Sequence, residues 1–440
     1  ADMFNVAVGY EAGGAITTGI QNTLIGGLAG DALNTGSTNV ALGVSALGAD
    51  TKGNSSVAIG SSALRLQNFT SNTDVYNVAI GRSAGENVTT GRMNTLIGGL
   101  AGDALTDADF NVAIGINALT ADTLGSKSVA IGDSALGAQN FTSATDSFNT
   151  AVGYSAGQAV STGTSNTLIG ALAGDAITTG VSNNAVGFGA LGATTTPNQN
   201  NAFGRNSLGS NTTGADNSGF GQNTLGSATT GSNNTAVGSD AGGSITTGVE
   251  NTLIGALAGD ALTDADFNVA IGKNALSADT LGSKSIAIGL GALQTQNFTS
   301  ATDSLNVAIG HLAGEKVTTG VQNTLVGGLA GDSLTDADFN IAIGFDALAG
   351  DTKGSKSTAV GRSALSSQNF TSATDTFNTA LGYFAGAGIT TGTSNTLIGG
   401  LAGDALTTGA SNVAIGINAL TAEQAGAHNT VVGEDAQAQS

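Results

Sequence analysis

The sequence predicts an all-β protein, a parallel β-solenoid (β-roll) of about 25 rungs with 17-residue repeats, in which several copies of the chain form a fibre. Three observations predict this fold. A short motif recurs at a fixed spacing along nearly the whole chain. Each copy opens with three β-prone residues that a glycine follows. Both faces of these short strands are apolar, which indicates burial on both sides.

The repeat is an N-x-x-x-G motif, and we call each copy of it a rung. Twenty-five rungs of 17 residues follow one another, except for four rungs of 21 residues and a short last one. The fifth position is Gly in all 25 rungs and the eighth is Ala in 23. The first position is Asn in 21 rungs and Ser in the four long ones. Repeats of this kind are the signature of a solenoid. The rungs begin at residues 5, 22, 39, 56, 77, 94, 111, 128, 149, 166, 183, 200, 217, 234, 251, 268, 285, 306, 323, 340, 357, 378, 395, 412 and 429.

A second period of four rungs lies on top of the first. The four types read "NVAVGYEAGG", "NTLIGGLAGD", "NVAIGINALT" and "SVAIGDSALG", and the ninth position is Gly in the first two and Leu in the others. We interpret 1–440 as one continuous β-solenoid that is part of a longer fibre. Its rungs are regular over 5–182 and 234–440, and more polar over 183–233, where the long rung is missing.

The invariant glycine of each rung directly follows the strand. Glycine tolerates a positive φ, so we expect an obligatory turn at this position. A second short segment around the eighth-position Ala and a polar turn then complete the rung. The turn glycines expected in the first eight rungs are Gly9, Gly26, Gly43, Gly60, Gly81, Gly98, Gly115 and Gly132.

Strands of three residues need neighbouring rungs, and then neighbouring chains, to bury them. Stacked rungs align the first-position asparagines, so we expect a ladder in which their amides bond from rung to rung. Alternation puts Val112 and Ile114 on one face and Ala113 on the other. A 17-residue rung has room inside for only one of these faces. The other face leaves an apolar stripe that implies association, and a homotrimer is the simplest closed arrangement for a rod.

The composition excludes several partners. The chain has 32 acidic and 12 basic residues and a net charge of −20, which disfavours nucleic acid and anionic membrane surfaces. No apolar run approaches the length of a membrane span, so no membrane insertion is expected. The absence of Cys excludes disulfide bonds and thiol chemistry.

The repeat resembles known fibre proteins. "NSVAIG" and "SVAIGSSAL" resemble the head repeats of YadA-like trimeric autotransporter adhesins, and this resemblance implies a left-handed coil in a homotrimer. The series "NTAVG … SAG … TTG … NTLIG" is similar to the repeat shafts of phage tail fibres, which often end in an endosialidase-type intramolecular chaperone. The resemblance covers residues 5 to 440. The adhesin heads have shorter rungs, and the chain has no neck, stalk, membrane barrel or chaperone domain.

Catalytic and cofactor motifs do not form a coherent site in the sequence. "GFGALG" (Gly187, Gly189 and Gly192) matches the dinucleotide fingerprint, but it falls on repeat positions and no helix is expected after it. His311 and His428 have no serine or aspartate partner, and we expect His311 on the surface. The chain is therefore predicted not to be an enzyme and to use no cofactor.

Two sets of aspartates occupy fixed repeat positions. The "TDADF" turns either bind calcium or, as we favour, carry solvated acids, and no metal site is predicted. The aspartates at the tenth position of the second rung type are expected to bond the local turn backbone. This second set is Asp31, Asp103, Asp175, Asp260, Asp332 and Asp404.

The four long rungs are the best binding candidates. Each contains Q-N-F-T-S-[NA]-T-D, and its four extra residues must leave the coil as a loop, where binding residues often lie. The Phe ring would stack on a sugar while the amides bond its hydroxyls. Alternatively, as we favour, each Phe folds back to cover an apolar groove at the trimer edge. N-F-T is also a glycosylation sequon. The candidate ligand-binding residues are Asn68, Phe69, Thr70, Asn140, Phe141, Thr142, Asn297, Phe298, Thr299, Asn369, Phe370 and Thr371.

These features favour an extracellular, non-enzymatic fibre. The first hypothesis is a phage tail fibre that attaches to a host-cell glycan or surface protein, and the close alternative is a bacterial surface adhesin. A second class of function is a purely structural filament or spacer. Ice binding ranks last, because TTG turns alternate with DAD and NFTSATD segments and give no uniform Thr face.

Overall fold

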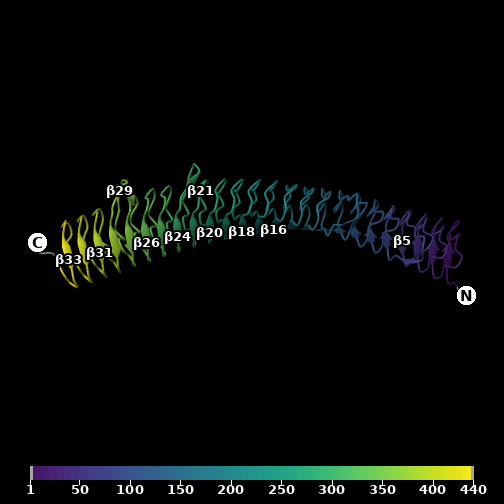
Figure 1. Cartoon of the computed structure of the whole chain (residues 1–440), viewed down its shortest axis with the longest axis horizontal. Helices are drawn as coiled ribbons and strands as arrows, with labels where there is room; N and C mark the ends of the chain where they lie inside the picture. The colour runs from purple at the N-terminus through teal and green to yellow at the C-terminus, as the bar shows by residue number, and fades with distance from the viewer. Residues whose placement is uncertain (1–2, 438–440) are drawn as a thin grey trace. The chain divides into compact units, whose positions relative to one another are not determined.

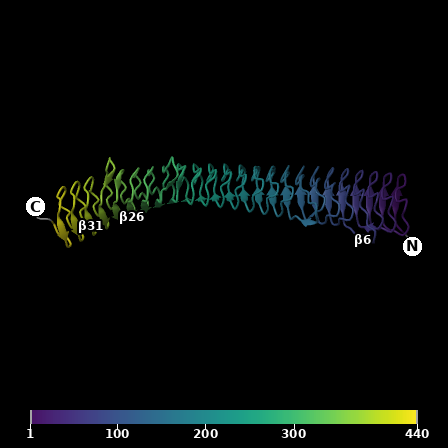
Figure 2. The ribbon, with the colours of Figure 1, turned by 45° about the horizontal axis from the view of Figure 1, so that its top comes forward.

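The computed structural model describes residues 3–437 and confirms the predicted fold class. The chain is an all-β parallel β-solenoid of about 25 turns that repeat about every 17 residues. It divides into two compact units, Ala1–Asn217 and Ser218–Ser440. The division falls within the more polar rungs 183–233. Within each unit, successive rungs lie side by side with their strands on one side of the coil (Figures 1 and 2).

The three-residue strands of the first unit begin directly after the first position of each rung. Two pairs of two-residue strands, β4 with β6 and β10 with β12, form small separate sheets at its long rungs. The strands are β1 (Val6–Val8), β2 (Thr23–Ile25), β3 (Val40–Leu42), β4 (Gly53–Asn54), β5 (Val57–Ile59), β6 (Thr73–Asp74), β7 (Val78–Ile80), β8 (Thr95–Ile97), β9 (Val112–Ile114), β10 (Gly125–Ser126), β11 (Val129–Ile131), β12 (Thr145–Asp146), β13 (Thr150–Val152), β14 (Thr167–Ile169), β15 (Asn184–Val186) and β16 (Asn201–Phe203).

The second unit repeats this arrangement. Its two-residue pairs are β21 with β23 and β27 with β29. The strands are β17 (Ser218–Phe220), β18 (Thr235–Val237), β19 (Thr252–Ile254), β20 (Val269–Ile271), β21 (Gly282–Ser283), β22 (Ile286–Ile288), β23 (Thr302–Asp303), β24 (Val307–Ile309), β25 (Thr324–Val326), β26 (Ile341–Ile343), β27 (Gly354–Ser355), β28 (Thr358–Val360), β29 (Thr374–Asp375), β30 (Thr379–Leu381), β31 (Thr396–Ile398), β32 (Val413–Ile415) and β33 (Thr430–Val432).

The rungs pair in exact register, so that each repeat position forms a column. Val112 of β9 lies opposite Thr95 of β8 and Val129 of β11. The same register continues across the long rung, because Val129 pairs with Thr150. The extra residues of a long rung therefore leave the strand column undisturbed.

The predicted asparagine ladder runs through the interior. The Asn166 side chain accepts a hydrogen bond from the Asn183 backbone N–H at 3.0 Å and donates to the Gly180 carbonyl at 2.9 Å. The Asn166 backbone N–H in turn donates to Oδ1 of Asn149 at 2.9 Å. Each side chain thus binds polar backbone groups that would otherwise be buried without partners.

The predicted turn glycines have the conformation that the repeat requires. Gly115 has a φ of +134°, and a Cβ at this position would lie 2.4 Å from the carbonyl oxygen of Gly132 in the next rung. Only glycine fits here, because both the φ and the close approach of the next backbone exclude a side chain. The eight glycines from Gly9 to Gly132 named above all have a φ between +129° and +141°.

Large and small residues alternate between two interior columns, which explains the period of four rungs. Leu96, at a third position, fills the space beside Gly85 and Gly102, where an added Cβ would lie 2.6 and 2.8 Å from its methyl groups. In the next rung the third position is Ala113, and the ninth is a fully buried Leu119. Interior volume is thereby conserved along the stack, as close packing requires.

The strands expose one of their two apolar faces. The third-position side chains are buried in every rung except the first, where Ala7 is exposed, whereas those at the second and fourth positions point outward and are half-buried or exposed. Ile169 and Ile343, for example, are 40% and 39% exposed. The prediction that a single coil can bury only one face is confirmed.

Candidate functional site

The four long rungs extend outward as loops. Their three tip residues, 70–72, 142–144, 299–301 and 371–373, are all exposed. In Figure 1 the loops beside β21 and beside β29 extend past the neighbouring rungs. The prediction that the extra residues leave the coil as a loop is confirmed.

A buried glutamine anchors each loop. In the rung that begins at 128, Gln139 donates to Oδ2 of Asp122 at 2.6 Å and to Ser128 at 2.8 Å. It accepts a hydrogen bond from the side chain of Asn149 at 2.9 Å. Gln139 thus replaces the side-chain part of the ladder, because in a regular rung the side-chain amide of one asparagine donates to Oδ1 of the asparagine before it. The Ser at the first position of each long rung is therefore part of the glutamine cluster.

The aspartate of this cluster binds the loop backbone. Oδ1 of Asp122 accepts hydrogen bonds from the N–H groups of Gly125 at 3.0 Å and Phe141 at 3.1 Å. Burial raises the pKa of Asp122, while hydrogen bonds from Gln139 and from the backbone oppose this shift.

The same cluster occurs at every long rung, with the Gln–Asp bond between 2.5 and 2.6 Å. Sequence reasoning missed these residues, although an aspartate recurs 17 residues before each glutamine. The four sets are Asp50, Ser56, Gln67 and Asn77; Asp122, Ser128, Gln139 and Asn149; Asp279, Ser285, Gln296 and Asn306; and Asp351, Ser357, Gln368 and Asn378.

The four phenylalanines are buried, which agrees with the favoured alternative that each ring folds back and disagrees with a sugar-stacking role. Phe69, Phe141, Phe298 and Phe370 are only 6–7% exposed. A Cβ at Gly125 would lie 2.7 Å from the ring of Phe141, so the ring covers this glycine of the preceding rung. A ring in this position has no free face for a sugar. The alternative, in which the ring folds back on the coil, agrees with this geometry.

The polar neighbours of each Phe differ in accessibility and bonding. Asn140 is exposed, but its Oδ1 accepts a hydrogen bond from Thr123 at 3.1 Å. Thr142 is exposed at the loop tip. Asn68, Asn297 and Asn369, and Thr70, Thr299 and Thr371, are exposed in the same way. The asparagines and threonines are therefore the accessible members of the predicted site, and the asparagine oxygen already accepts a hydrogen bond from the preceding rung.

Charged pairs tie the far end of three loops to the preceding rung. Lys127 lies 2.5 Å from Asp146 and 5.2 Å from the ring centre of Phe148. Lys284 with Asp303, and Lys356 with Asp375, form the same ion pair. Exposed pairs of this kind contribute little stability, so they mainly orient the loop ends.

The other aspartates bind their own coil. In the "TDADF" turns, Asp109 accepts the Arg92 N–H at 2.7 Å and Asp107 accepts the Thr90 hydroxyl at 2.6 Å. Within residues 3–437, no three His, Asp or Glu side chains are grouped so that they could hold a metal ion. His311 is exposed, as expected.

The tenth-position aspartates only partly match the expectation that they bond the turn backbone. One carboxylate oxygen of Asp260, Asp332 and Asp404 is buried without a hydrogen-bond partner. Burial raises the pKa of these three residues and of Asp175, mainly because the charged form loses solvation.

A threonine column lies beside the polar turns. Thr89 donates to the carbonyl of Thr106 at 3.2 Å, and Thr106 donates to that of Thr123 at 3.0 Å. The pattern recurs at Thr178, Thr246 and many other rungs. Because these hydroxyls bond within the coil, the column joins neighbouring rungs.

Comparisons with protein-family models and with curated proteins give no match for this chain. Between residues 3 and 437, the structure has no helix of the length and apolarity that a membrane span requires.

Truncation of the phenylalanine should distinguish a structural loop from a ligand platform. We expect Phe141→Ala to destabilise the first unit by about 3–5 kcal/mol, because a nearly buried ring leaves a cavity. Thr142→Ala, at the adjacent exposed tip, should change stability by less than about 0.5 kcal/mol. Urea denaturation measures both. Equal stability of Phe141→Ala and the wild type would contradict the packing described here.

Proposed function

We propose that the protein is a non-enzymatic extracellular fibre that forms a homotrimer and attaches to a cell surface. A phage tail fibre is the form we favour, and a bacterial surface adhesin is the alternative. The observation that carries this proposal is the apolar outer face of the strands, which implies a multi-chain rod. The resemblance to YadA-like heads and to phage fibre shafts supports the same assignment.

The outer face is too apolar for an isolated chain. Its second and fourth positions contribute Val, Ile, Leu, Phe and Thr, except for Asn184, Asn201 and Ser218 in the more polar rungs. Soluble monomers rarely expose apolar patches larger than a few hundred Å². Large residues at the end of a rung, directly before the first position of the next rung, add to the exposed apolar surface. Among them are Phe110, Phe148, Phe267, Phe339 and Phe377, which are 47–57% exposed.

A second copy of the chain suits this face best. Each copy presents columns with the same spacing of about 4.8 Å between rungs, so two identical faces match over many rungs. A closed ring of three copies covers the face of each chain and leaves none free, as closed symmetry requires. The long loops remain available for a ligand if they lie at the outside of this assembly.

Attachment, rather than a spacer role alone, is supported by the loops. A spacer needs only the regular rungs. The four long rungs instead carry exposed Thr-Ser tips on a buried anchor of Asp, Gln and Ser, which is a rigid support for a polar surface group.

A measurement of the oligomeric state tests whether the outer strand face is covered by other copies of the chain. We expect the wild type to have the mass of three 42.4 kDa chains in light scattering. Ile309→Lys with Ile343→Lys should shift the mass to one chain, because both residues lie on the outer face with about 38–39% exposure. Thr319→Lys, at an exposed polar turn, is the matched control and should remain trimeric. A monomeric wild type would refute the trimer.

Binding to cells tests attachment. The fluorescently labelled fibre should bind at least one strain in a panel of Gram-negative and Gram-positive bacteria. The quadruple change T70R/T142R/T299R/T371R at the loop tips should reduce this binding at least tenfold. The control T18R/T162R/T319R/T391R places the same charge at exposed turns of regular rungs and should bind normally. No binding by the wild type would favour a spacer function. Normal binding by the tip variant would exclude the loop tips as the binding site.

A further inference from the structure

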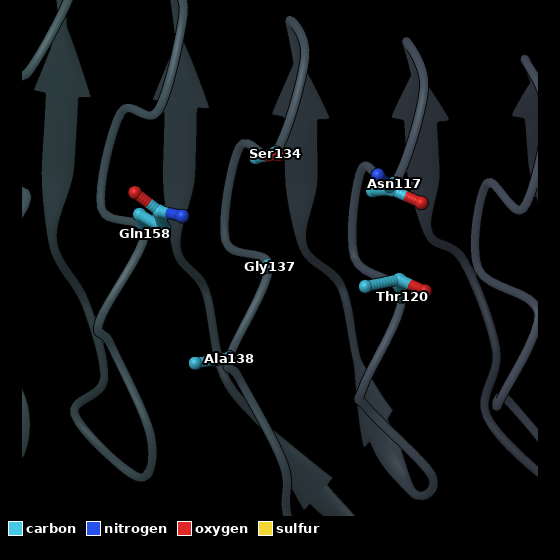
Figure 3. A pocket seen from close by; sticks show the side chains of 6 residues that line it. All are labelled: Asn117, Thr120, Ser134, Gly137, Ala138 and Gln158. Carbon is cyan, nitrogen blue, oxygen red and sulfur yellow. The ribbon is translucent and has the colours of Figure 1, made fainter.

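A polar hollow lies beside one long rung, away from its loop tip. Its volume is about 290 Å³, and it extends over the three rungs that begin at 111, 128 and 149. Figure 3 shows Gln158 on one neighbouring rung, Asn117 and Thr120 on the other, and Gly137 and Ala138 between them. Ser134 completes the lining.

We propose that this hollow binds one neutral pyranose unit of a cell-surface glycan. The inference rests on the proposed attachment function and adds a site that is separate from the loop tips. A volume near 300 Å³ is at the lower end of ligand sites, so it suits a single sugar ring.

Gly137 leaves space between Thr120 and Gln158, and larger residues occupy the same position in the other three long rungs. Arg65 is the first of these, and it forms an ion pair with Glu86 of the next rung at 2.8 Å. Gln294 is the second, and its Oε1 would lie 3.0 Å from a Cβ at Gly291, so this side chain folds over the corresponding space. Ser366 is the third. The chain therefore contains its own filled versions of this site.

Two aspartates orient the hydroxyl groups of the lining. Thr120 donates to Oδ1 of Asp103 at 2.5 Å, and Ser134 donates to Oδ1 of Asp133 at 2.7 Å. Because each hydroxyl has one proton, its lone pairs are left to accept hydrogen bonds from a ligand. The side-chain amides of Asn117 and Gln158 can both donate and accept. This combination suits the hydroxyl groups of a sugar.

The surrounding charge favours a neutral ligand. The hydroxyls of the lining bond to the acids Asp103 and Asp133. No basic residue lines the hollow, and the whole chain has a net charge of −20. An anionic sugar or a phosphate would be repelled.

The hollow also avoids the surface that we assign to the trimer. In Figure 3 its lining residues lie on the segment of each rung that passes in front of the strands, on the other side of the coil from the outer strand face. Covering the strand face would leave the hollow open.

Saturation-transfer NMR with methyl glycosides of glucose, galactose, mannose and N-acetylglucosamine tests the site on the full chain. We expect the wild type to bind at least one of these glycosides. Gly137→Gln, which copies Gln294, should weaken that binding at least tenfold. Gly209→Gln is the matched control: it is also a tenth-position glycine, and its added Cβ would meet a backbone carbonyl at 3.1 Å, as at Gly137. This control should bind as the wild type does.

The outcomes separate this inference from the attachment function. Absence of binding for all four glycosides, or normal binding by Gly137→Gln, overturns the site even if the fibre attaches to cells. Glycoside binding that Gly137→Gln abolishes supports the site even if no strain in the cell panel is bound. Loss of binding in Gly209→Gln as well would show that the substitution disturbs the coil in general, and would refute the hollow as the binding site.

Discussion

The side-chain amide of the first-position asparagine is the interaction on which the structure depends. A three-residue strand leaves much of each rung without strand pairing, and buried backbone groups there still require partners. The asparagine supplies an acceptor to the rung on one side and a donor to a carbonyl of its own turn. With this ladder and the fifth-position glycine in place, large and small residues can alternate at the third and ninth positions as long as the interior columns remain filled.

The long rungs show what happens when the ladder changes. Serine at the first position is too short to continue it, and a glutamine from the same rung accepts a hydrogen bond from the side-chain amide of the next asparagine instead. Asp122 then binds both this glutamine and the backbone at the base of the loop. The loop is thus attached to the interior by the same kind of bond that stacks the rungs, and the phenylalanine closes the space above it. A rigid loop of this kind can present polar tips without unfolding the coil.

Much of the fold could be predicted because each repeat position has one physical requirement. The fifth position requires glycine, because Gly115 has a positive φ and the backbone of Gly132 approaches it closely. The outward apolar side chains of Val112 and Ile114 require a partner surface outside the coil. The burial of Phe141 was not predictable with certainty, since an aromatic residue in a polar loop fits both an exposed and a folded position. Leu119, with a φ of +55°, adopts a conformation that sequence preferences disfavour, and the packed column imposes it. The hollow at Gly137 is formed by side chains of three separate rungs, so no single sequence motif predicts it.

Residue-resolved hydrogen–deuterium exchange of backbone amides tests the ladder most directly. The backbone N–H groups of Asn166 and Asn183 bond only to side chains in this ladder. We predict that they exchange as slowly as the N–H of Thr167, which bonds to the carbonyl of Asn183. Asn149 follows Ser128 and lacks an asparagine acceptor, so its N–H should exchange faster. Rapid exchange at Asn166 and Asn183 beside slow exchange at Thr167 would contradict the account, because the strands would then stack without the asparagine side chains.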